Sequence, residues 1–135
     1  MIPVLVLTHG DLATAILESA RMIDPHLVEV TDAVTLAWEV DTDAATTDLR
    51  KRWKAMDGGD GVRVLTDMFG GTATNLALPF LEPDRIEIVT GVNLPMLVKL
   101  GSLRGLDIPL HELSSRLAAA GQKSIRLASE FLRRR

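Results

Sequence analysis

Short apolar runs recur along the chain and have the pattern of β-strands. Residues 2–8 and 62–67 are almost continuous in Val and Leu, which is typical of strands that helices cover on both faces of a parallel sheet. Residues 85–90 form a third such run, and residues 34–40 predict a further strand nearer the edge of the sheet. Residues 28–30, with the sequence VEV, fit more than one structure. We therefore expect a sheet built mainly from these runs.

Between the runs, apolar residues recur at helical spacing, as Leu12 and Ile16 do within residues 11–23. Pro79 is expected to end or kink the helix predicted at residues 73–81. Asn93 has the pattern of a helix N-cap, and the proline that follows it at residue 95 fits the first turn of that helix. The segments predicted to be helical are residues 11–23, 43–56, 73–81, a stretch that begins after Asn93, and about 110–133, which reads as one long amphipathic helix with Gly121 as its weak point. Strands that alternate with helices predict an α/β sandwich around a mostly parallel sheet.

Composition narrows the class of protein. The 135 residues are 47% hydrophobic and 24% charged, so we expect one globular domain over residues 1–135. The formal net charge of −3 argues against a nucleic-acid partner, and the absence of cysteine excludes disulfides and thiol chemistry. The first residues lack the basic segment of a signal peptide, and no apolar run approaches the roughly 20 residues that span a bilayer. We therefore expect a cytoplasmic protein without direct membrane insertion.

Three of the predicted strands end in residues that can carry chemistry. These residues are Thr8, His9 and Gly10 after the first strand, Asp67, Gly70, Gly71 and Thr72 after the second, and Thr90 to Asn93 after the third. The carboxyl ends of parallel strands meet at one edge of a sheet, where ligands bind in open α/β folds. We therefore expect all of these groups to converge on one place.

The residue types at these strand ends suit phosphoryl transfer through a phosphohistidine. An imidazole such as that of His9 can act as the nucleophile. A carboxylate such as that of Asp67 can bind one ring nitrogen, which fixes the tautomer and makes the other nitrogen more nucleophilic. Glycines let backbone N–H groups approach an anion closely, a following helix N-terminus adds positive potential, and Thr72 adds a hydroxyl donor. Such transfer depends mainly on positioning and charge stabilisation.

Each of these residues also has a structural explanation when it is taken alone. Gly70 and Gly71 fit a plain turn, and Thr72 fits a helix N-cap. Only the convergence of the strand ends favours function. His26 and His111 lack the spacing of a zinc site and are expected on the surface, so no metal site is predicted. The chain also has no nucleophile elbow and no P-loop, which disfavours acyl hydrolases and ATPases of those types.

Three motifs resemble the mannose-type EIIA domain of the bacterial phosphoenolpyruvate:sugar phosphotransferase system (PTS). They are THGDLA at residues 8–13, LTDMFGGTATNLAL at residues 65–78 and VTGVNLPML at residues 89–97, in the order that the family has them. The resemblance extends from residue 2 to about residue 127. It implies a doubly wound, three-layer α/β/α fold with a mostly parallel sheet. It also implies a homodimer in which an antiparallel edge strand is exchanged between the subunits.

The resemblance further implies a phosphotransferase that works as a relay. The carrier protein HPr donates a phosphoryl group to EIIA, which passes it to an EIIB partner, and no cofactor is implied. By match, His9 is phosphorylated on Nε2 and Asp67 holds Nδ1. The other implied site residues are Gly70, Gly71 and Thr72 around the phosphate, and Thr8, Gly10 and Asn93 in the wall of the site.

The chain departs from the family pattern at two places. The family usually has GGSP where residues 70–73 read GGTA. Thr72 can replace the serine hydroxyl, whereas losing the proline is expected to loosen the start of the helix. Residues 24–41 do not follow the usual pattern, which affects the second strand and the edge of the sheet. The chain stops after Arg135, so we expect the EIIB partner to be a separate chain.

Alternative functions remain open at this point. The chain fits a regulatory interaction module whose phosphorylation state is read by its partners without transport. It also fits, less well, the phosphocarrier subunit that serves dihydroxyacetone kinase. A flavodoxin-like nucleotide or flavin binder is a further alternative, although aromatic residues make up only 4% of the chain and none is tyrosine. Nothing in the sequence identifies a sugar.

Overall fold

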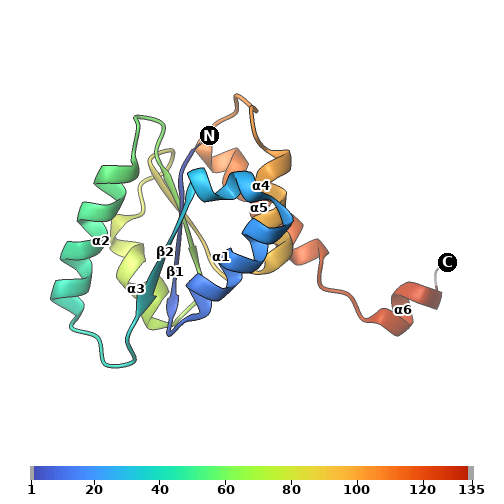
Figure 1. The fold of residues 1–135 in the computed structure, drawn as a ribbon, viewed down its shortest axis with the longest axis horizontal. Helices are drawn as coiled ribbons and strands as arrows, with labels where there is room; N and C mark the ends of the chain where they lie inside the picture. The colour runs from blue at the N-terminus through green and yellow to red at the C-terminus, as the bar shows by residue number, and fades with distance from the viewer. Residues whose placement is uncertain (1, 134–135) are drawn as a thin grey trace.

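The computed structural model describes residues 2–133, and its centre is one four-stranded sheet (Figure 1). The strands stand in the order β2-β1-β3-β4, and all three pairings between them are parallel. Their bounds are Val4–His9 for β1, Thr31–Leu36 for β2, Val62–Thr66 for β3 and Ile86–Val89 for β4. The carboxyl ends of all four strands therefore lie at the same edge of the sheet.

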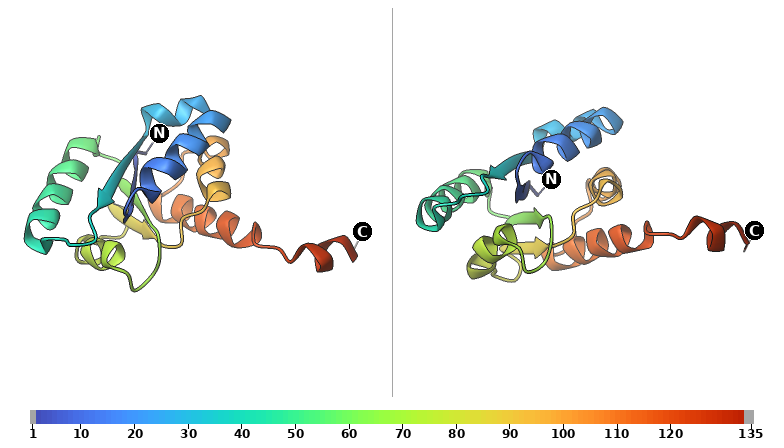
Figure 2. Two further views of the ribbon diagram at one scale, coloured as in Figure 1. Left: turned by 60° about the horizontal axis from the view of Figure 1, so that its bottom comes forward. Right: turned by 90° about the horizontal axis from the view of Figure 1, so that it is seen from below.

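Helices cover both faces of the sheet, as the view from below in Figure 2 shows. The α-helices are α1 (Leu12–Ile23), α2 (Thr42–Met56), α3 (Thr72–Ala77), α4 (Leu94–Ser102), α5 (Leu110–Lys123) and α6 (Ala128–Arg133), and the 3-10 helices are η1 (Pro25–Glu29) and η2 (Leu78–Phe80). Within residues 2–133, no helix is long and apolar enough to cross a membrane. This three-layer α/β/α arrangement confirms the fold class expected from the sequence.

The alternation of side chains along β1 builds two hydrophobic cores. Val4 and Val6 pack with α1, α4 and α5, whereas Leu5 and Leu7 pack with α2 and α3. All four side chains are fully buried. A strand that is buried on both faces needs apolar residues at every position, which explains the continuous run seen in the sequence.

The second strand lies earlier in the chain than the sequence predicted. We expected a strand at residues 34–40, but β2 covers Thr31–Leu36 and residues 28–30 belong to η1 and the turn after it. At the first residue of β2, Nη2 of Arg21 donates to the Thr31 carbonyl at 2.7 Å and to Thr31 Oγ1 at 3.0 Å. Trp38, which had been counted in the strand, lies beyond its end. The apolar pattern misled the prediction because Trp38 does not face either core.

The predicted long C-terminal helix is in fact two helices. Helix α5 ends at Lys123, and α6 begins at Ala128 after a short non-helical stretch. Gly121 is not the break, because it is buried inside α5 against Met96 and Asn93 of the neighbouring segment. Residues 122–133 are all exposed, so no core packing holds this stretch as one helix. Figure 1 shows α6 carried away from the body of the molecule on an arm.

The predicted antiparallel edge strand is not found in the sheet of residues 2–133. The only antiparallel pairing in this part of the chain is an isolated bridge between Glu82 and Ile86. Strand β4 therefore stands at one edge of the sheet with no strand beyond it. The exchange of a strand between subunits stays a prediction.

Candidate functional site

The candidate site begins where two neighbouring strands end. Strand β1 runs beside β3 with Leu7 opposite Thr66, so His9, the last residue of β1, and Asp67, the first residue after β3, lie close together. The structure thus brings together the two residues that the sequence placed at separate strand ends. Parallel pairing is the physical reason, because it aligns both carboxyl ends at one edge.

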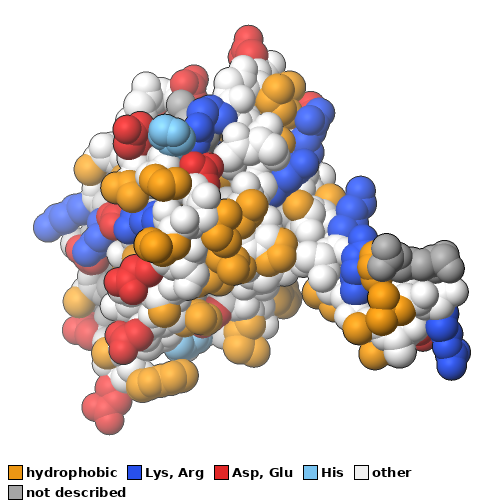
Figure 3. Space-filling view, turned by 45° about the vertical axis from the view of Figure 1, so that its right-hand side comes forward, with side chains coloured by type: hydrophobic (Ala, Val, Ile, Leu, Met, Phe, Trp, Pro, Cys, Tyr) orange, Lys and Arg blue, Asp and Glu red, His pale blue; other side chains and the backbone are white. Residues whose placement is uncertain are grey.

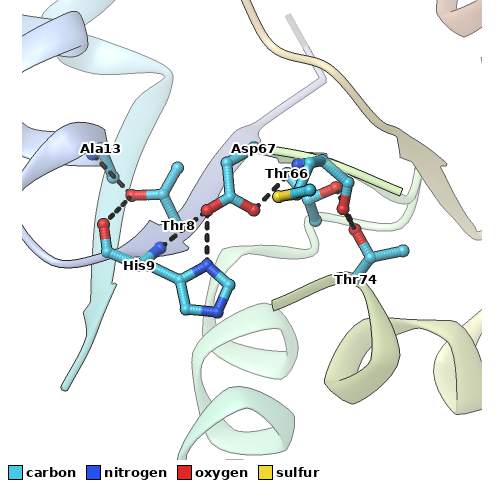
Figure 4. Close-up of polar contacts among 7 residues, drawn as sticks. Thr8, His9, Ala13, Thr66, Asp67 and Thr74 are labelled. Carbon is cyan, nitrogen blue, oxygen red and sulfur yellow. Dashed lines mark hydrogen bonds and ion pairs between the residues drawn. The ribbon is translucent and has the colours of Figure 1, made fainter. Parts of the chain in front are cut away.

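The Asp67 carboxylate contacts both the ring and the backbone N–H of His9 (Figure 4). Oδ2 of Asp67 lies 2.7 Å from Nδ1 of His9 and accepts the backbone N–H of the same residue at 3.0 Å. Oδ1 of Asp67 accepts the backbone N–H of Met68 at 2.9 Å. The two side chains are 17% and 11% exposed, so the pair is sheltered and still reachable from solvent. Figure 4 shows the second ring nitrogen, Nε2, pointing away from Asp67.

The charge of Asp67 defines the tautomer of His9. Burial acts to raise the pKa of Asp67, but hydrogen bonds from the His9 backbone, the His9 ring and the Met68 backbone outweigh it and hold that pKa below 3.8. An ionised carboxylate can only accept hydrogen bonds, so Nδ1 carries the proton when the ring is neutral. The lone pair of neutral His9 is therefore on Nε2.

The Thr8 side chain makes hydrogen bonds within the turn between β1 and α1. Its side chain is fully buried, and its Oγ1 accepts the backbone N–H of Ala13 at 2.7 Å and donates to the carbonyl of His9 at 3.3 Å. Asp11, the residue at the N-cap of α1, makes no side-chain capping bond. Thr8 therefore supplies the cap of α1 from the preceding strand. We had predicted Thr8 as part of the wall, and its hydroxyl is occupied by this structural role.

The loop from Met68 to Gly71 is held by two buried threonines that the sequence analysis did not single out. Thr74 Oγ1 donates to the Met68 carbonyl at 2.6 Å and lies 2.7 Å from Thr66 Oγ1. Since the one proton of the Thr74 hydroxyl goes to Met68, Thr66 is the donor to Thr74. The only signal in the sequence was that polar residues occupy positions where β3 and α3 are otherwise apolar.

Of the three predicted phosphate-binding residues, the structure places Gly71 beside the His9 ring. A Cβ added to Gly71 would stand 3.3 Å from Cε1 of His9, the carbon between the two ring nitrogens. Gly70 has a φ of +83°, a conformation that favours glycine. Thr72 is the first residue of α3 and is exposed. The N-cap of α3 is Gly71, so Thr72 is free of the capping role that was its structural explanation.

The side chain of Asn93, predicted as part of the site wall, makes structural hydrogen bonds to α4 and α5. Its Oδ1 accepts the backbone N–H of Met96 at 3.0 Å, which caps α4 as the sequence predicted. Its Nδ2 donates to the carbonyl of Gly121 at 3.1 Å and so ties α4 to α5. The carbonyl of Thr66 accepts the backbone N–H of Val92 at 2.9 Å, which joins this loop to the end of β3. Both polar atoms of the Asn93 side chain are therefore used in structural contacts.

One large apolar side chain contacts the polar pair, and two more follow it in the chain. Trp38 stacks on the His9 ring with 5.3 Å between the ring centroids and 17° between the ring planes. Met68 and Phe69, which follow Asp67 directly, are also exposed. The apolar pattern predicts Trp38 in a strand and gives no functional signal for Met68 or Phe69. Their exposure was the missing signal, because an apolar residue in a sequence is first assigned to a core.

The other histidines lie on the surface, as predicted. His26 is exposed, and His111 is exposed with its Nδ1 3.5 Å from Glu87. Within residues 2–133, no group of three or more His, Cys, Asp or Glu side chains is arranged to hold a metal ion.

The chain is similar to known proteins in both sequence and fold. Residues 3–117 match the family described as "PTS system fructose IIA component". The chain is 33% identical over 136 residues to the PTS system fructose-specific EIIA component of Bacillus subtilis (strain 168), covering 98% of this chain and 90% of that protein.

Solved structures with the same fold include two streptococcal proteins. One is the phosphotransferase system component EIIA from Streptococcus agalactiae, with a TM-score of 0.82 and 24% identity over 96% of this chain and 99% of that one. The other is the PTS IIA protein associated with the fucose utilization operon of Streptococcus pneumoniae, with a TM-score of 0.81 and 29% identity over 96% and 95% of the two chains.

Proposed function

We propose a phosphocarrier function on His9 for this chain, which belongs to the fructose/mannose EIIA family of the PTS. In this function, His9 Nε2 accepts a phosphoryl group from phospho-HPr and passes it to an EIIB protein on a separate chain. The observation that carries the proposal is the 2.7 Å contact between His9 Nδ1 and Asp67 Oδ2, made by a ring that solvent still reaches. We also propose that the relay works in the cytoplasm and serves sugar uptake or PTS-based regulation.

The accepting step follows from the tautomer. The Nε2 lone pair of His9 forms a bond to phosphorus while the bond from phosphorus to the donor nitrogen breaks, and the donor nitrogen keeps that electron pair. Positive charge develops on the His9 ring, and the ionised Asp67 stabilises it through the proton on Nδ1. Transfer to EIIB reverses these changes, with Nε2 as the leaving nitrogen.

The loop beside the ring supplies the proposed contacts to the phosphoryl oxygens. Gly71 lies against Cε1 of His9, so a group bonded to Nε2 comes close to this part of the loop. Backbone N–H groups of Gly70, Gly71 and Thr72 and the exposed hydroxyl of Thr72 are the candidate donors. The bonds from Thr74 and Thr66 hold this loop in place before the phosphoryl group arrives. Such preorganised donors are the main means by which proteins assist phosphoryl transfer.

The apolar surroundings favour protein partners over a small substrate. Trp38, Met68 and Phe69 expose large side chains around or next to the reactive pair. Exposed apolar patches with a polar rim mark protein interaction sites. HPr and EIIB must each bring their own reactive residue to Nε2, so we propose that both dock on this surface.

We propose that the chain is a homodimer joined through its C-terminal arm. The arm, defined here as residues 124–133, exposes Ile125, Leu127, Phe131 and Leu132, and Figure 3 shows apolar side chains on it away from the body. Beside the open edge of β4 lies a groove of about 380 Å³ whose lining includes Ile88, Ser114 and Ala118. The buried Oγ of Ser114 has no partner within residues 2–133. Exchange of the arm would bring residues 125–127 of one subunit, which belong to no helix or strand, to the β4 edge of the other.

The proposed function is tested by intact mass after incubation with phosphoenolpyruvate, enzyme I and HPr. Wild type should gain one acid-labile phosphoryl group, and His9→Ala should gain none while its circular dichroism spectrum is unchanged. His111→Ala is the matched control, because it removes another histidine from the surface and should be labelled like wild type. Labelling of His9→Ala, or none of wild type with an active donor, would reject the assignment. Adding EIIB proteins to the labelled protein then separates transport from regulation.

A further inference from the structure

Trp38 lies over one face of the His9 ring and belongs to neither core. The ring centroids are 5.3 Å apart and the planes differ by 17°, which is a stacked arrangement. Trp38 follows β2 in a segment that is neither helix nor strand, and it is 81% exposed. So exposed an indole gives up most of the stabilisation that burying a tryptophan provides. Its position therefore calls for an explanation other than packing.

Gly10, in the turn that carries His9, lies beside the indole of Trp38. It has a φ of +54°, and a Cβ added to it would lie 3.8 Å from Nε1 of Trp38. Its backbone N–H donates to the carbonyl of Leu36 at 2.9 Å, and Leu36 is the last residue of β2. The turn after β1 and the segment after β2 are thus tied together where Trp38 and His9 meet.

Three different contacts surround the His9 ring. Asp67 holds Nδ1, Gly71 lies against Cε1 and Trp38 covers a face. A hydrogen bond at one nitrogen leaves the ring able to rock about that bond, whereas a planar neighbour at its face restricts this motion. Nε2 has no hydrogen-bond partner within residues 2–133. These contacts therefore fix the orientation of the imidazole and leave its Nε2 without a partner in the described part of the chain.

We propose that Trp38 is a positioning residue for His9, which holds the imidazole plane so that the Nε2 lone pair points toward the incoming phosphorus. This inference rests on the proposed phosphocarrier function. Transfer between two histidines requires the attacking lone pair, the phosphorus and the leaving nitrogen to be nearly in line, so a ring that rocks spends less time in a reactive geometry. Trp38 acts through His9 and makes no bond to the phosphoryl group.

The stacking contact is tested first by NMR of the His9 ring protons in the unphosphorylated protein. An indole stacked on the imidazole shifts the Hδ2 and Hε1 resonances upfield through its ring current. Trp38→Ala should move both resonances downfield, and Trp38→Phe should retain part of the upfield shift. This measurement needs no phosphoryl donor, so it is independent of the proposed function.

The positioning role is then tested by the rate of phosphoryl transfer from phospho-HPr. Trp38→Ala should lower the single-turnover rate at saturating HPr by about 2- to 13-fold, the range that the loss of one stacked aromatic pair corresponds to. Trp38→Phe should recover most of the rate. Met22→Ala is the matched control, because it removes an exposed apolar side chain from the far end of α1 and should leave the rate unchanged.

The outcomes separate the two proposals. Upfield shifts that vanish in Trp38→Ala, together with a slower saturated rate that phenylalanine restores, support the positioning role. His9 resonances that do not respond to Trp38→Ala overturn it, as does a variant whose weaker HPr binding accounts for the entire loss. No transfer to wild type in the presence of a normal ring-current shift rejects the phosphocarrier function and leaves the contact itself established.

Discussion

One carboxylate oxygen, Oδ2 of Asp67, binds both the backbone N–H and the ring Nδ1 of His9. The bond to the backbone places the residue, and the bond to the ring orients it. Because the two residues end neighbouring parallel strands, this double contact also joins β1 to β3 at the site. Asp67 thus positions the His9 ring, sets its tautomer and supplies the negative charge beside it.

Asp67→Asn should slow phosphoryl transfer to His9 by about 10- to 100-fold. The amide can still form one hydrogen bond to His9, but it has no charge to stabilise the cationic ring in the transition state. The measurement is single-turnover transfer from phospho-HPr. Asp11→Asn is the control, because it removes an exposed carboxylate two residues from His9 and should not change the rate. Equal rates for wild type and Asp67→Asn would remove Asp67 from the mechanism.

The stability that Asp67 contributes should depend on pH. The folded protein holds the pKa of Asp67 below its ordinary value of 3.8, so the ionised carboxylate stabilises the fold. This stabilisation is fully present above the unfolded pKa and is lost as the pH falls through the lowered folded pKa. The difference in free energy of unfolding between wild type and Asp67→Asn should therefore shrink as the pH falls below about 4.

Urea titrations of the two proteins between pH 3 and pH 7 would measure this difference. A difference that grows as the pH falls would contradict the lowered pKa. Asp11→Asn again provides a comparison at an exposed carboxylate.

Arg63→Met should keep or raise the free energy of unfolding. Arg63 is 1% exposed, and it donates from Nη2 to the carbonyl of Ile2 at 2.7 Å while its Nε has no partner within residues 2–133. Burial lowers the pKa of its guanidinium to about 10. Replacing a buried charge by an apolar side chain of similar size is often neutral or stabilising.

The comparison for Arg63→Met is Arg85→Met, which removes an exposed arginine that pairs with Asp57 at 3.3 Å. That variant should lose no more than about 1 kcal/mol, the usual worth of a surface ion pair. A loss of several kcal/mol in Arg63→Met would contradict this expectation and show that the contacts of Arg63 outweigh the cost of burying its charge.

Removal of residues 124–135 should convert the proposed dimer to a monomer. The arm packs on no core within its own chain, so the body should keep its fold and its far-ultraviolet circular dichroism per residue. Light scattering coupled to size-exclusion chromatography measures the mass directly. A wild type that is monomeric at all concentrations, or a truncated protein that stays dimeric, would contradict arm exchange.

The sequence by itself determined the local elements and the residues of the candidate pair. Continuous apolar runs identified β1 and β3, helical spacing identified α1 and α2, and Asn93 was identified as the cap of α4. These features depend on neighbours in the chain, so the pattern carries them. The meeting of His9 with Asp67 was also predictable, because parallel strands bring their carboxyl ends to one edge.

Only the tertiary structure decided the contacts that depend on which distant segments meet. It placed β2 at Thr31–Leu36 beside β1, divided the C-terminal helix where core contacts end, and placed Gly121 against Met96 instead of at a break. It also stacked Trp38 on His9, whereas the sequence had counted that residue in a strand. An apolar side chain has the same signature in a sequence whether it fills a core or covers a reactive ring, and only the surrounding fold distinguishes the two.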